Sequence, residues 1–142
     1  MKKILIILVI LILILLALTI YQKNKVRNQE GIKITYKDQE TFISYKEIRS
    51  NKQISFTTNS GNMFNGYDIL SILNSIDVPV NSDSKYIFHS KDGGTLNLVK
   101  EENEIFCLVF QEDASGQFIR LVIPTDEFSQ RWIKYLVAIE IE

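Results

Sequence analysis

Two basic side chains near the carboxyl terminus could bind an anion. Arg120 lies in an apolar run that predicts a strand, on the same face as Phe118 and Val122. Its planar guanidinium matches the geometry of a phosphate or a carboxylate. Lys134 lies on the charged face of the last predicted strand, beside Glu140. Each has an ordinary alternative: an ion pair at the sheet edge for Arg120, and a solvated strand face for Lys134.

The only histidine and the only cysteine do not form a recognisable metal or catalytic site. His89 could be a base, a metal ligand or a pH sensor, but a zinc site needs three or four ligands. The closeness of His89, Ser90 and Asp92 in sequence does not define a triad. Cys107 lies within a run that is apolar on both faces, which predicts a buried thiol with a raised pKa. We therefore expect no catalytic residues and no metal ligands.

Two further features have structural interpretations. Residues 101–104, Glu-Glu-Asn-Glu, lack the spacing of a calcium loop and are predicted to form a solvated acidic turn. Trp132 is either a core anchor or an exposed binding aromatic, and its neighbours Ile133 and Tyr135 favour the core.

The elements that would position these side chains predict an α+β fold, a mixed β-sheet domain with one or two short helices. Apolar residues at helical spacing predict a helix at residues 69–76, and a capping box at residues 44–47 predicts a shorter one. Turn residues at 91–94 and 113–116 predict hairpins. Apolar patterns indicate strands at residues 32–36, 53–58, 86–90, 95–99, 105–110, 118–123 and 135–141.

The amino terminus carries an uncharged apolar run at residues 4–20, in which only Thr19 is polar. As a helix this run would reach about 25 Å, near the lower limit for crossing a bilayer. It is longer than an ordinary signal-peptide core, and residues 17–19 form a poor cleavage site, so we expect an uncleaved anchor. The flanking basic residues are nearly balanced. A very short tail before an apolar run normally acts as an export signal, which places the following domain outside the cytoplasm.

The chain is predicted to divide into four segments. These are a cytoplasmic tail (1–3), a transmembrane signal-anchor (4–20), a linker (21–30) and one domain (31–142). The domain holds 11 Lys and Arg against 16 Asp and Glu, a net charge of −5. Without a basic patch, nucleic acid is not an expected partner.

Four motifs follow one another through the predicted domain. They are Gly66–Leu73 in the helix, Ser90–Gly93 in a turn, Phe118–Pro124 with its central arginine, and Trp132–Leu136 before the last strand. In order and spacing they resemble the sulfite-oxidase-like oxidoreductase molybdopterin-binding domain family, over roughly residues 31–142. The resemblance implies that family's fold, molybdopterin as the candidate cofactor, and a cofactor-binding role for Arg120 and Lys134.

The chain departs from that family at the metal ligand. Catalytic members bind molybdenum through a cysteine in a long amino-terminal half, and the matching position here would precede residue 31. The resemblance therefore implies a shortened form for which we expect no cofactor, with molybdopterin possible only by resemblance, and an enzyme is the less favoured interpretation. We expect a membrane-anchored, extracytoplasmic, non-catalytic module that binds a small anionic ligand or a protein partner. Two alternatives are an oxidoreductase module that shares molybdopterin with another subunit, and a structural or assembly factor at the membrane.

Overall fold

The structure is a computed structural model that describes residues 2–27, 30–81 and 83–142, with side chains in the first range only from Leu8 to Tyr21. It divides into two units, Met1–Glu30 and Gly31–Glu142. Residue 1 of the predicted tail and residues 28 and 29 of the predicted linker lie outside the described residues.

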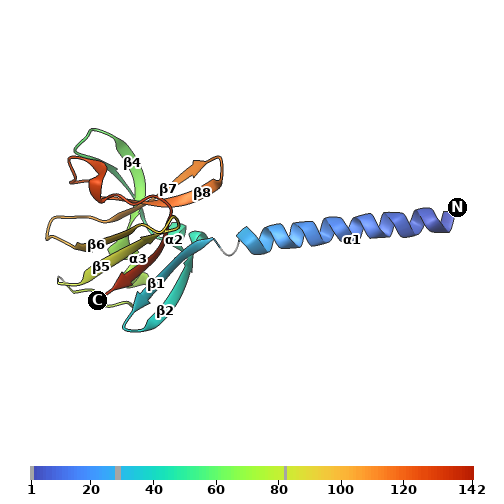
Figure 1. Cartoon of the computed structure of the whole chain (residues 1–142), viewed down its shortest axis with the longest axis horizontal. Helices are drawn as coiled ribbons and strands as arrows, with labels where there is room; N and C mark the ends of the chain where they lie inside the picture. Colours follow the sequence, from blue (N-terminus) through green and yellow to red (C-terminus); the bar gives the residue numbers. More distant parts are fainter. Residues whose placement is uncertain (1, 28–29, 82) are drawn as a thin grey trace. The chain divides into compact units, whose positions relative to one another are not determined.

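The first unit is the helix α1 (Lys2–Arg27), shown in Figure 1. It continues beyond residue 20, so residues 21–27 of the predicted linker are helical. Between Leu8 and Ile20, eleven large apolar side chains are each 47–61% exposed. Within the described residues, no helix is both long enough and apolar enough to cross a membrane.

The second unit is an α+β domain, as predicted, and its strands form two sheets (Figure 1). The five-stranded sheet has the order β2-β1-β9-β5-β6, and the four-stranded sheet has the order β3-β4-β7-β8. Strand β1 pairs with β9 in parallel, and the other pairings are antiparallel. The strands are β1 (Gly31–Tyr36), β2 (Gln39–Ser44), β3 (Gln53–Thr57), β4 (Met63–Asp68), β5 (Lys85–Ser90), β6 (Thr95–Val99), β7 (Cys107–Asp113), β8 (Gly116–Val122) and β9 (Leu136–Ile141).

Local capping residues start the short helices. At α2 (Tyr45–Ser50) the predicted capping box is confirmed, because the Glu47 carboxylate accepts the backbone N–H of Ser44 at 2.8 Å while the Ser44 hydroxyl accepts that of Glu47. Asp68 caps the amino-terminal end of helix α3 (Ile69–Ser75), and its carboxylate accepts the backbone N–H of Leu70 at 3.2 Å. A single 3-10 turn, η1 (Ser129–Arg131), precedes β9.

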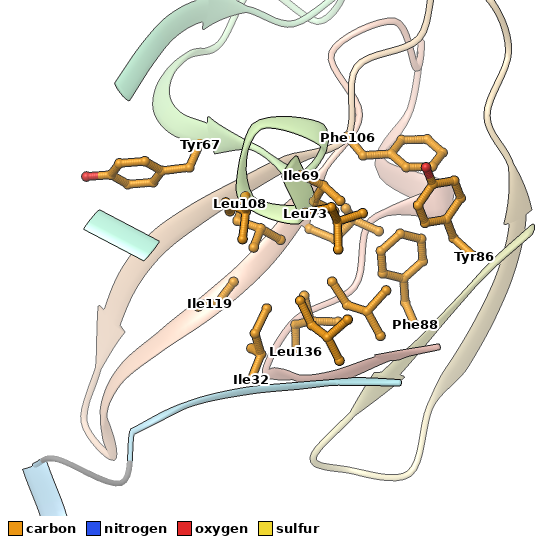
Figure 2. Packing of buried hydrophobic residues seen from close by; sticks show 14 of the residues in the cluster. Ile32, Tyr67, Ile69, Leu73, Tyr86, Phe88, Phe106, Leu108, Ile119 and Leu136 are labelled. Carbon is orange, nitrogen blue, oxygen red and sulfur yellow. The ribbon is translucent and has the colours of Figure 1, made fainter. Parts of the chain in front are cut away.

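The core contains apolar side chains from both sheets and from α2 and α3 (Figure 2). Strand β8 contributes Ile119 and Leu121, and β5 contributes Tyr86 and Phe88. Phe106 packs edge-on against both rings of β5, with centroids 5.3 and 5.7 Å away. Burying each such side chain contributes about 2 kcal/mol of stability, so this shared core fixes the register of both sheets.

Two strands were missed by the sequence patterns. In β2 only Ile43 is buried, so the strand has no apolar alternation to detect. In β4, Gly66 belongs to the strand, whereas its motif predicts that it belongs to the following helix. Its Cα instead lies so close to β7 that a Cβ there would be 2.8 Å from the carbonyl oxygen of Leu108.

Candidate anion-binding site

The four-stranded sheet has a second face, opposite the core, that carries Arg120. Because Ile119 and Leu121 point into the core, Phe118 and Arg120 must point the other way. The register pairs Arg120 with Val109 on β7. We call this the outer face and define it by Phe56, Phe64, Val109, Gln111, Phe118 and Arg120.

Arg120 is partly buried and has no carboxylate counter-charge. Its Nη1 lies 3.4 Å from Oε1 of Gln111, and its Cζ lies 5.8 Å from the ring centre of Trp132. Its Nε is buried without a hydrogen-bond partner. No carboxylate among the described residues forms an ion pair with it, so the alternative of an ion pair at the sheet edge is wrong. The guanidinium of Arg120 therefore lacks a counter-charge in the described part of the chain, and its Nε–H donor has no partner there.

Trp132 forms an aromatic wall beside this guanidinium. Its Nε1 donates to the carbonyl oxygen of Ile123 at 3.2 Å, which fixes the indole ring. Phe64 packs edge-on against it at 5.8 Å, and Phe56 stacks on Phe64 at 6.0 Å. The indole is partly buried and packs against the core, as the core interpretation of Trp132 predicts.

Lys134 differs from Arg120 because its charge is already paired. Lys134 precedes β9, so the prediction that it lies on the charged face of that strand is wrong. Its Nζ lies 3.4 Å from Oδ2 of Asp113 and above the rings of Tyr135 (4.4 Å) and Phe118 (4.9 Å). The same carboxylate accepts from the Tyr135 hydroxyl. The Ser115 hydroxyl, then the Tyr135 hydroxyl, hold the pKa of Asp113 well below its usual range.

The structure therefore brings the two predicted basic residues to the same face but gives them different surroundings. Phe118, under Lys134, and Arg120 are neighbours on one face of β8. Arg120 has no anionic partner among the described residues, whereas an anion at Lys134 would compete with Asp113.

His89 and Ser90 do not cooperate in the described structure. The Nε2 atom of His89 lies 3.0 Å from Oε1 of Glu140 without hydrogen-bond geometry, and the two form an ion pair only when the imidazole is protonated. Ser90 is buried on the opposite face of β5, where its hydroxyl donates to the carbonyl oxygen of Lys134 at 2.5 Å. His89 and Ser90 therefore form no nucleophile–base pair, and the hydroxyl that lies near the imidazole is that of Thr95, 3.5 Å from Nδ1 of His89.

The structure confirms the prediction for Cys107, a fully buried thiol. It is the first residue of β7 and not a mid-strand position. Burial, then the negative charge of Asp68, raise the pKa of its thiol to about 12. A molybdenum ligand must be a thiolate, so this residue does not fit that role. Among the described residues, no group of three or more His, Cys, Asp or Glu side chains is arranged to hold a metal ion.

The predicted solvated acidic turn is wrong for Glu104, whose side chain is only 5% exposed. Its carboxylate accepts from Nη2 of Arg131 at 2.5 Å. The buried carboxylate of Asp126 accepts from Nε of the same guanidinium at 3.0 Å. Glu101 and Glu102 are exposed, as predicted.

Comparisons with known proteins found no family model that matches this chain and no similar protein among curated sequences. The resemblance to the sulfite-oxidase-like family stays a prediction from motif order.

Replacing Arg131 with methionine should destabilise the domain by about 3 kcal/mol, because two buried carboxylates lose their shared counter-charge. Urea unfolding of the full chain, followed by tryptophan fluorescence, measures the change. The matched control is Lys33→Met, whose partner Glu40 is well exposed, and its cost should stay below about 1 kcal/mol. Equal costs for the two variants would contradict the view that burial makes the Arg131 pairs important.

Proposed function

We propose that this protein is a membrane-anchored, extracytoplasmic binding module that takes a small anionic ligand through Arg120. The domain is proposed to be a shortened, non-catalytic relative of the sulfite-oxidase-like molybdopterin-binding domains. The observation that carries the proposal is the partly buried guanidinium of Arg120, which has a buried unpartnered Nε and no carboxylate beside it.

The charge of the partly buried Arg120 guanidinium is not compensated by an opposite charge among the described residues, which is unfavourable. Taking a charged group partly out of water is unfavourable unless an opposite charge or hydrogen bonds replace the lost hydration. For Arg120 the neutral amide of Gln111 and the ring of Trp132 replace only part of it. A phosphate or carboxylate could accept from the Nη groups of the guanidinium and balance its charge. The carboxylate of a partner protein offers the same chemistry as a small ligand.

The chemistry of the thiol supports a binding role over a redox role. A molybdenum centre would need an accessible thiolate, and burial holds Cys107 as a thiol. The outer face therefore binds a ligand without a redox role for Cys107.

The exposed apolar surface of α1 supports the membrane anchor. Large apolar side chains occur all around this helix between Leu8 and Ile20, and such a surface is unfavourable in water. The apolar sequence continues to Ile4, before the described side chains begin. A lipid environment would cover this surface.

Arg120→Met should abolish stabilisation by added anions, because the cationic guanidinium that would bind them is lost. Thermal melts of the full chain with inorganic phosphate or benzoate provide the test, since a ligand that prefers the folded state raises the melting temperature. At a hundredfold excess over Kd, the unmodified chain should gain about 2.7 kcal/mol.

Arg49→Met is the matched control for that experiment. Arg49 is also an arginine beside an aromatic ring, 4.1 Å from the centre of Phe110, but it is exposed and bonded to Gln117 at 2.5 Å. Its loss should leave the anion effect intact. If the Arg49 variant lost as much as the Arg120 variant, or if neither anion stabilised the unmodified chain, the assignment of the site would be wrong.

Deletion of residues 1–30 should release the protein from membranes. The full chain is expected in the pellet after extraction with alkaline carbonate, whereas the shortened chain should be soluble because its apolar helix is gone. Protease added to intact cells should digest the domain of the full chain. Recovery of the full chain in the carbonate supernatant would refute the anchor, and protection from the external protease would refute the orientation.

A further inference from the structure

Two adjoining cavities form an acidic trough on the domain, separate from the outer face. One, of about 450 Å³, is bounded by the β1–β2 turn and the end of β9. The other, of about 560 Å³, is bounded by the start of α3 and the end of β6. They share Asn81 and Asp83, which makes them one continuous depression.

The trough concentrates most of the domain's net negative charge. It contains six of the 16 carboxylates of residues 31–142 but only two of the 11 basic side chains. Within the trough, Glu140 lies 3.0 Å from His89 and Glu142 lies 3.0 Å from Lys85. The carboxylates are Asp38, Asp83, Glu101, Glu102, Glu140 and Glu142, and the basic residues are Lys37 and Lys100.

The second cavity adds an apolar lining to this charge. Leu70, Val80 and Val99 line it together with Tyr86, which is only 1% exposed. The hydroxyl of Tyr86 is buried and has no hydrogen-bond partner among the described residues. Figure 2 shows this side chain against the ring of Phe106. Burial, then the charge of Asp68, raise the pKa of Tyr86 to about 12, so at neutral pH its hydroxyl is a donor.

We propose that the trough binds an extended basic peptide segment in which lysine or arginine alternates with aliphatic residues. An aliphatic side chain occupies the space between Leu70 and Val99, and the basic side chains meet the carboxylates of the rim. A carbonyl oxygen of the peptide accepts from Tyr86. Two joined cavities suit a chain better than a small amine, because a peptide can place cations along both.

The test uses a fluorescein-labelled peptide, Lys-Leu-Lys-Leu-Lys-Leu-Lys, and the full chain in nanodiscs of neutral lipid, with empty nanodiscs subtracted. Fluorescence anisotropy should show saturable binding that weakens with salt. The double variant Glu101→Gln/Glu102→Gln should bind roughly fivefold more weakly, as expected for two lost surface charge pairs. The control Glu112→Gln/Glu127→Gln makes the same charge change at exposed positions outside the trough and should stay within about twofold.

Tyr86→Phe separates a binding role from a structural one. Removing an unpartnered buried hydroxyl should leave the melting temperature unchanged or higher, whereas peptide affinity should fall by about fivefold because one hydrogen bond is lost. Equal weakening by both double variants, equal binding of the peptide with glutamate in place of lysine, or unchanged affinity of the Tyr86 variant would each overturn the proposal. The Arg120→Met variant should bind the peptide normally, so this result is independent of the anion site.

Discussion

The alternation of side chains along β8 is the constraint on which the candidate site depends. Ile119 and Leu121 are fully buried in the core shared by the two sheets. A shift of the strand by one residue would place the charged Arg120 in that core and remove both apolar side chains from it, at a cost of several kcal/mol. The packing of the core therefore holds the guanidinium on the outer face, independently of any ligand.

The basic residues near the carboxyl terminus differ in the groups that neighbour their charges. Arg131 is shared between two buried carboxylates, and Lys134 is paired with Asp113 and lies over two aromatic rings. Both are accounted for by structural roles. Arg120 has an amide and an indole as neighbours but no counter-charge in the described part of the domain. This contrast, more than the presence of a basic residue as such, distinguishes it as a binding group.

The sequence predicts local features well because their causes are local. Apolar alternation located most strands, the capping box located α2, and the apolar surroundings of Cys107 indicated a buried thiol. The contacts that define the site join distant segments and leave no such pattern. Examples are Trp132 beside Arg120, and Glu104 bonded to Arg131 across 27 positions of the chain. The Phe56–Phe64 pair was missed because β4 itself has no clear alternation.

The most direct measurement of the central claim is the arginine Nε–H region of a ¹H–¹⁵N NMR spectrum, with Arg120 assigned by substitution. Anion binding at Arg120 predicts that added inorganic phosphate moves and sharpens the Arg120 signal, because an anion at the guanidinium changes the surroundings of its Nε–H, while the Arg49 signal stays in place. An Arg120 signal that does not respond, or one that moves only in parallel with Arg49, would contradict the assignment of Arg120 as the anion-binding group.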